Sequence, residues 1–228
     1  MNENAAPSSL PPILSIFPLT GTLLLPGTRL PLHIFEPRYR NMVDDALGSD
    51  GVFGMIQPFA PQPDNFPQAG AEAARPDLYD VGCAGYIERW EKAPDGRYLI
   101  QLQGLSRFRI KEELAQEKGY RRVRPDYSCF PDTAGGESPQ PDRTRLIQAL
   151  ENYGKRQGLT IDLKQVEPIP DPDLISVLGI AMPFHPAEKQ ALLEAPSLKD
   201  REQVLVSLLE FGSEEPPLDP EPGSRTLN

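Results

Sequence analysis

The hydrophobic pattern of this chain changes its period once, and that change limits the fold more than any other feature. Before residue 129 the apolar side chains alternate with polar ones in short runs, as in Arg97–Ile110, which is the period of strands. After residue 141 the apolar positions recur about every 3.6 residues, as in helices, starting near Leu146. Strands followed by helices indicate an α+β fold, with a β-rich half followed by a small all-α helical bundle.

Composition gives the expected boundaries of these parts. Residues 1–12 are polar and rich in proline, and residues 213–228 are acidic and rich in proline, so we expect both ends to be disordered. Between them we expect a β-rich subdomain at 13–128, a linker at 129–141 and a helical bundle at 142–212.

The stretch Phe17–Leu47 predicts the corner where the sheet meets its first helix. A first strand is expected at Ile13–Leu19, the loop after it carries the Leu25-Pro26-Gly27 turn signal, and a second strand follows over residues 29–35. Pro37 suits the first position of a helix, where its missing N–H costs nothing. We therefore predict a helix from Pro37 to Leu47.

A hairpin is predicted further along the chain, from Asp80–Trp90 and Arg97–Ile110, joined by an Asp-Gly turn signal. Glycines within strands commonly mark bulges or the close approach of another backbone. This hairpin carries three of them, Gly82, Gly85 and Gly104. They favour a strongly coiled sheet or a small barrel.

Several blocks of the sequence resemble the N-terminal, substrate-binding domain of Lon proteases, in the form found as stand-alone bacterial proteins. The residues that carry the resemblance are Phe17–Leu47, Gly82–Gly85, Asp95–Arg97, Gly104–Ile110, Glu188–Glu194 and Arg201. The resemblance implies a PUA-like pseudo-barrel followed by a helical bundle. It also implies recognition of unfolded or exposed polypeptide segments that are passed to a protease.

Motifs for catalysis are absent from the sequence, so we predict that the chain is not an enzyme. There is no G-x-x-x-x-G-K-[ST] loop for phosphates and no G-x-S-x-G nucleophile elbow. A full-length Lon protease would continue into ATPase and protease modules, whose chemistry these residues do not supply. With two histidines, two cysteines and no C-x-x-C pair, we predict neither a metal site nor a cofactor. We interpret His33 as a half-buried strand residue whose ring nitrogen is hydrogen-bonded.

The balance of charges argues against nucleic acid or an anionic membrane as partner. Acidic residues outnumber basic ones by 33 to 23, whereas proteins that bind these partners usually carry basic excess. The basic cluster Arg121–Arg124 is interpreted as the solvated face of a strand. Two cysteines, no signal-peptide pattern and no apolar run of membrane-spanning length predict reduced thiols and a cytoplasmic location. The oligomeric state stays open, and we assume a monomer.

Six side chains are candidates for contacting a polypeptide, although each has an alternative structural role. They are Phe59 and Phe66 in the proline-rich loop 58–76, Tyr86 and Trp90 on the hairpin, and Arg38 and Arg107 as receptors for a peptide carboxylate. A competing hypothesis for the arginines is that Glu36 pairs with Arg107 or Arg109 and ties the helix to the sheet.

We therefore predict a non-catalytic polypeptide-binding module whose partners are unfolded client chains and a separate ATP-dependent protease. Two alternatives stay open at this point. One is a small-molecule sensor that uses a cleft between the two halves. The other is RNA binding, because PUA-like folds include RNA-binding members, although fold alone does not establish function.

Overall fold

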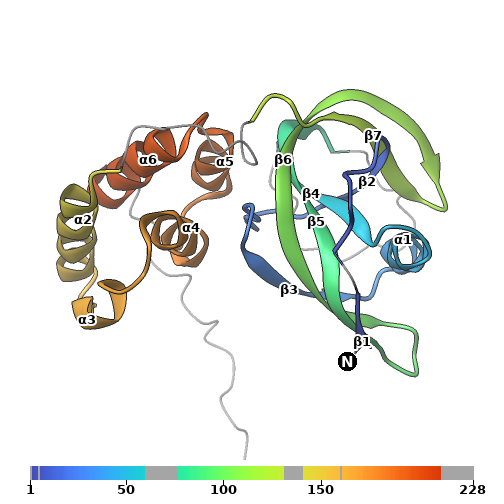
Figure 1. Ribbon diagram of the computed structural model, residues 1–228, viewed down its shortest axis with the longest axis horizontal. Coiled ribbons are helices and arrows are strands. Elements are labelled where there is room, and N and C mark those ends of the chain that lie inside the picture. The colour runs from blue at the N-terminus through green and yellow to red at the C-terminus, as the bar shows by residue number, and fades with distance from the viewer. Residues whose placement is uncertain (1, 5, 60–75, 131–140, 160, 212–228) are drawn as a thin grey trace, which may run out of the picture.

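The computed structural model describes residues 2–4, 6–59, 76–130, 141–159 and 161–211 of the chain. Its strands are β1 (Asn2–Glu3), β2 (Leu14–Pro18), β3 (Arg29–Ile34), β4 (Val52–Pro58), β5 (Leu78–Lys92), β6 (Tyr98–Glu117) and β7 (Tyr120–Asp126). Its helices are α1 (Pro37–Leu47), α2 (Arg143–Arg156), α3 (Leu163–Val166), α4 (Asp171–Ala181), α5 (Pro186–Glu194) and α6 (Leu198–Phe211). Figure 1 shows the strands and α1 in one half, with the later helices beside them.

The strands of the described residues form one sheet that closes on itself. They lie in the order β1-β5-β4-β2-β7-β6-β3, and an added pairing between β5 and β6 joins β5, β4, β2, β7 and β6 into a small barrel. β1 and β3 lie outside this ring, paired with β5 and β6. The prediction of an α+β fold, with a β-rich pseudo-barrel followed by helices, is confirmed.

The glycines of the long hairpin lie where backbones approach closely, as their positions predicted. A Cβ atom added to Gly104 would lie 2.1 Å from the carbonyl oxygen of Leu25, and one on Gly82 would lie 2.5 Å from that of Met55. The pairing of β5 with β6 shifts register beside Gly85. These contacts allow the two long strands to coil around the barrel core.

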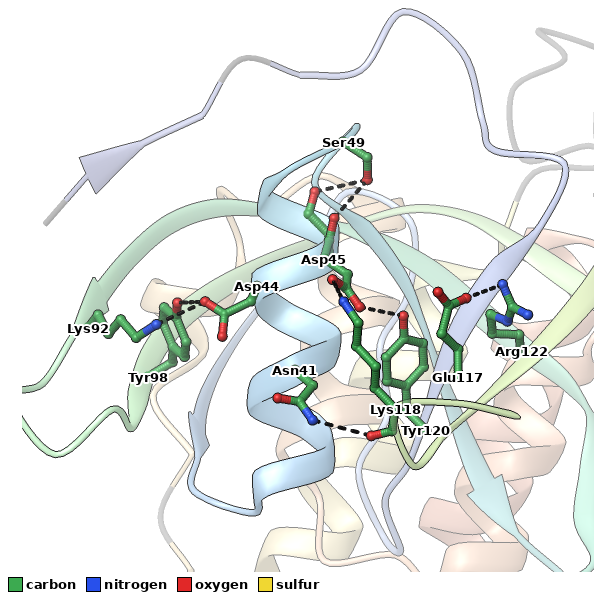
Figure 2. Close-up of polar contacts among 11 residues, drawn as sticks. Asn41, Asp44, Asp45, Ser49, Lys92, Tyr98, Glu117, Lys118, Tyr120 and Arg122 are labelled. Atoms are coloured by element: carbon green, nitrogen blue, oxygen red, sulfur yellow. Dashed lines mark hydrogen bonds and ion pairs between the residues drawn. The ribbon is translucent and has the colours of Figure 1, made fainter. Parts of the chain in front are cut away.

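Helix α1 has the predicted bounds, with Pro37 at its start and Tyr39, Met42, Val43 and Ala46 buried. Near its end, two aspartates hold two hairpins (Figure 2). The donors are Lys92 and Tyr98 for Asp44, and Lys118 and Tyr120 for Asp45. Burial alone would raise the pKa of both carboxyls, but these donors outweigh it and hold each pKa below its ordinary value. Helix α1 therefore joins the β5–β6 hairpin to the β6–β7 hairpin.

The two halves meet through helix α5 and a set of buried amides. The side-chain amide of Gln57 on β4 donates to the Gln190 side chain and to the carbonyl of Pro186, both at 3.1 Å. Gln190 in turn donates to the carbonyl of Val81 at 3.0 Å. Around these bonds one hydrophobic cluster runs from barrel residues such as Leu102 into the helices. Because buried amides need all their partners, this joint fixes how α5 sits on the barrel.

Three parts of the fold differ from expectation. Strand β6 continues to Glu117, whereas the pattern predicted its end at Ile110. The short helix α3 was not predicted. Asn2–Glu3 forms strand β1, although we expected residues 1–12 to be disordered. The expectations for 131–140 and 213–228, and for most of the loop 58–76, concern residues outside those that the structure describes.

Candidate functional site

The loop candidates are only partly described. Phe59 is 65% exposed, and its ring centroid lies 5.1 Å from that of Tyr79. Phe66 lies outside the described residues. Phe59 is therefore accessible to a partner, at the end of the barrel where β5 begins.

The hairpin candidates lie further along β5. Tyr86 is buried, and its hydroxyl is hydrogen-bonded to the side chain of Gln103 at 3.2 Å. Trp90 is half-buried and packs beside Tyr98, with ring centroids 6.0 Å apart. Burial leaves little of Tyr86 for a partner to contact, whereas part of Trp90 is accessible. Phe59 and Trp90 lie toward opposite ends of β5, so the structure does not bring them together.

Arg107 is 2% exposed and reaches across from β6 to the end of helix α5. Its guanidinium donates to the carbonyls of Leu193 at 2.9 Å and Ala195 at 2.5 Å. It also lies 4.1 Å from the ring centroid of Phe130. A positive charge at a helix C-terminus is favourable, because the last carbonyls lack partners within the helix. Arg107 therefore fastens the helical half to the barrel.

The proposed pairing of Glu36 with Arg107 or Arg109 is wrong. The carboxylate of Glu36 pairs instead with Arg38, two positions on, at 2.9 Å. Arg38 also lies over the ring of Tyr39, 4.6 Å from its centroid. The reason is geometric: Arg107 points across the joint toward α5, away from the start of α1 where Glu36 lies.

A group of exposed side chains that we did not predict lies on the outer face of β3 and β6. Strand pairing places His33 opposite Leu99, and Leu99 is 52% exposed. Phe35 is 40% exposed, and its ring lies 5.9 Å from that of His33. His33 itself is exposed, contrary to our half-buried interpretation. We call Pro31, His33, Phe35 and Leu99 the outer patch. The sequence signal for this patch was Leu99, an apolar residue between Tyr98 and Ile100, which both face inward.

Among the residues that the structure describes, no strand pairs with the second edge of β3, which we call its free edge, and this edge carries a gap in its hydrogen-bond donors. The carbonyl of Thr28 accepts from the N–H of Gly104 on β6 at 2.9 Å. Backbone groups of alternate residues point to the same side, so Leu30 and Leu32 also face β6. Arg29, Pro31 and His33 then face the free edge, and proline has no N–H to offer there. A partner on this side of the barrel would contact chiefly the side chains of the outer patch.

The basic cluster on β7 is neutralised within the barrel. Arg121 pairs with Glu113 at 2.7 Å and Arg124 with Glu112 at 3.2 Å, and Arg122 pairs with Glu117. All three acidic partners belong to β6. These pairs leave little free positive charge for phosphate groups, so the structure gives RNA binding no support.

A pocket of about 410 Å³ lies in the helical half, between α2 and α3. It is lined by Arg143, Thr144, Ile147, Leu163 and Glu167. Within the described ranges, no group of histidine, cysteine, aspartate or glutamate is placed to hold a metal ion. In the same ranges no helix is both long and apolar enough to cross a membrane. Cys83 is buried and Cys129 is exposed, and the two are not joined in a disulfide.

A sequence model of one protein family, described as the ATP-dependent protease La (LON) substrate-binding domain, matches residues 13–210. The chain belongs to this family. Lon protease 2 of Myxococcus xanthus is 30% identical over 216 residues, and Lon protease of Flavobacterium johnsoniae is 27% identical over 208 residues. Both matches cover 88% of this chain and 24% of the relative. The chain thus spans about a quarter of the length of these curated Lon proteases.

Solved structures of Lon N-terminal domains share the fold. A Lon N-terminal domain protein from Xanthomonas campestris has a TM-score of 0.60 at 22% identity, covering 86% of this chain and 97% of that one. The N-terminal domain of a Mycobacterium avium complex Lon protease has a TM-score of 0.58 at 18% identity, covering 87% and 98%. At these identities the likeness establishes the barrel-and-helix architecture of the Lon N-terminal domain.

Proposed function

We propose that the chain is a non-catalytic module that binds unfolded polypeptide segments through the outer patch. The observation that carries the proposal is the exposure of Phe35 and Leu99 together with His33 on one face of the sheet. Grouped apolar side chains at a surface mark interaction sites far more often than single ones do. Membership of the Lon substrate-binding domain family supports the same role.

The physical basis is the burial of apolar surface on both partners. A folded protein hides its large apolar side chains, whereas an unfolded segment presents them and can cover Phe35 and Leu99. Because side chains of the outer patch lie on a sheet that the barrel holds rigid, little ordering of the module itself opposes binding. The patch is small, so we expect weak binding. Unfolded chains that make more apolar contacts with the patch should bind more tightly than those that make fewer.

The test is binding of reduced and carboxymethylated α-lactalbumin, which cannot refold, measured by fluorescence anisotropy. We expect Phe35→Ser together with Leu99→Ser to weaken binding about thirtyfold, because two apolar contacts of roughly 1 kcal/mol each are lost. The matched control is Leu159→Ser with Phe211→Ser, two exposed apolar residues of the helical half. Equal weakening in both double variants would refute the outer patch as the site.

Delivery of clients to proteolysis is the finer part of the proposal. A module that holds unfolded segments serves proteolysis only if an ATP-dependent protease receives them, and the curated relatives carry the Lon name. We infer that such a protease is the partner, in the cytoplasm. Capture of an ATP-dependent protease on the immobilised chain, with and without carboxymethylated α-lactalbumin, tests this. Failure to retain the protease in either condition would refute recruitment.

A second candidate function rests on the pocket between α2 and α3. Its volume of about 410 Å³ falls in the range of small-molecule sites. We expected such a site at the junction of the two halves, but this pocket lies within the helices. A thermal shift against a panel of metabolites tests ligand binding, with Ile147→Trp as the variant that fills the pocket. A shift that persists in Ile147→Trp would exclude the pocket as its origin.

A further inference from the structure

The chain already holds one extended segment on the edge of β5. Strand β1 pairs antiparallel with the end of β5, Asn2 opposite Trp90 and Glu3 opposite Arg89. The N–H of Asn4 donates to the carbonyl of Glu88, and its side-chain amide donates to that of Ile87, both at 3.0 Å. We call residues 2–4 the strap and Ile87–Trp90 the β5 edge.

The strap is held by few interactions that depend on its own side chains. Asn2 and Glu3 are both exposed and bury no apolar side chain. The ion pair between Glu3 and Arg89 spans 3.0 Å, with side chains 67% and 50% exposed, and such surface pairs contribute little. What remains is chiefly backbone hydrogen bonding, which any extended polypeptide can provide. The strap is therefore replaceable by another segment of suitable chemistry.

The neighbouring side chains define that chemistry. Residues directly opposite each other in antiparallel strands share a face, so the residue in the place of Asn2 lies beside the half-buried ring of Trp90. An apolar side chain there would cover more of the indole than asparagine does. The next residue faces Arg89, whose charge complements a carboxylate. The edge therefore fits an apolar residue followed by aspartate or glutamate.

We propose that the β5 edge is a docking site for extended client segments with this apolar–acidic pair, and that the strap occupies it as an intramolecular competitor. The proposal rests on the polypeptide-binding function above and names a substrate class and a form of regulation for it. Arg89 lies on the same outer face as the outer patch, since β6 pairs with both β5 and β3 there. A client at the edge can thus extend toward Leu99.

Competition from within the same chain lowers the apparent affinity for any client. The apparent dissociation constant equals the intrinsic one divided by the fraction of molecules whose edge is open. A tethered segment competes at a high effective concentration, on the order of millimolar for a short linker. Releasing the strap should therefore tighten client binding by roughly tenfold.

The experiment uses the full chain and a labelled peptide with the sequence of residues 1–12, followed by fluorescence anisotropy. The released variant carries Glu3→Lys and Asn4→Pro, which remove the ion pair and both bonds of Asn4. Its matched control carries Ser8→Lys and Ser9→Pro, at exposed positions of the same segment. We expect roughly tenfold tighter peptide binding by the released variant than by the control, and still tighter binding when the peptide carries Asn2→Leu.

Charge specificity is tested in the released variant. Arg89→Glu should abolish the contribution that Glu3 of the peptide makes to binding. Arg97→Glu should leave that contribution unchanged, because Arg97 is equally exposed but pairs with Asp95 in the hairpin turn. Equal binding by the released variant and its control, or no effect of Arg89→Glu, would overturn the proposal. If carboxymethylated α-lactalbumin still binds while the peptide does not, the docking edge fails and the outer patch stands. If neither probe binds, both proposals fail.

Discussion

Replacing Arg107 by methionine should lower the free energy of unfolding by about 3–6 kcal/mol, because the change removes the cation that ends helix α5. The guanidinium donates to the carbonyls of Leu193 and Ala195, at 2.9 and 2.5 Å. A hydrogen bond from a charged donor contributes about 1.5–3 kcal/mol. Methionine fills a similar volume but donates nothing, so both buried carbonyls would lose this partner while remaining away from water.

Urea denaturation followed by circular dichroism measures the effect. A domain of this kind has about 5–15 kcal/mol of stability in total, so the expected loss shifts the midpoint strongly. The matched control is Arg109→Met, which lies two positions along the same strand with an exposed side chain and should change stability by less than about 0.5 kcal/mol. Equal midpoints for the two variants would refute the role assigned to Arg107. Hydrogen exchange should show the α5 amides losing protection first.

Two further predictions concern the barrel. Gly104→Ala should lower the free energy of unfolding by about 1–3 kcal/mol, because the added Cβ would lie 2.1 Å from the Leu25 carbonyl oxygen. The effect is read as a fall in melting temperature. The control, Gly48→Ala, should be close to neutral, because its Cβ would meet only ordinary contacts at 3.5 Å. The double variant Asp44→Asn with Asp45→Asn should flatten the pH dependence of stability. In the parent chain both pKa values are held below the ordinary value near 4. The stability that these carboxylates add is therefore complete above about pH 5 and is lost as the pH falls. Urea midpoints at pH 7 and pH 3 that differ equally in variant and parent chain would contradict this.

The elements that the sequence predicted best are those whose cause is local. Helix α1 has the predicted bounds because Pro37 fixes its start and an apolar face of period 3.6 marks its length. The long hairpin was predictable because its turn residues and alternating side chains lie within one segment. The end of β6 was not, because its last residues alternate no apolar side chains. That stretch is a strand because it pairs with β7, where Glu113 also forms an ion pair with Arg121. The pattern along one strand does not reveal which segment will pair with it.

The candidate site likewise combines features with a local cause, which could be predicted, and features that depend on residues distant in the sequence, which could not. The exposure of Phe59 and the partial exposure of Trp90 agree with their positions in a loop and near the end of a strand. We predicted Glu36 as a partner of Arg107, whereas its acceptors lie 86 and 88 positions away, at the C-terminal end of α5. The outer patch was missed because it assembles residues from two strands that pair through the fold. Strand β1 was missed because backbone hydrogen bonds, which carry no sequence signal, hold it.

Pro31 has a consequence for how the protein behaves when crowded with copies of itself. A sheet edge with an unbroken row of donors can serve as a template on which strands of further molecules add side by side. The proline interrupts that row in the middle of β3, directly beside the apolar side chains that the proposed function needs at the surface. The chain can therefore expose apolar side chains while offering copies of itself no continuous row of backbone hydrogen-bond donors. Under the proposed function, binding of other chains and pairing with copies of itself would thus depend on different features of β3.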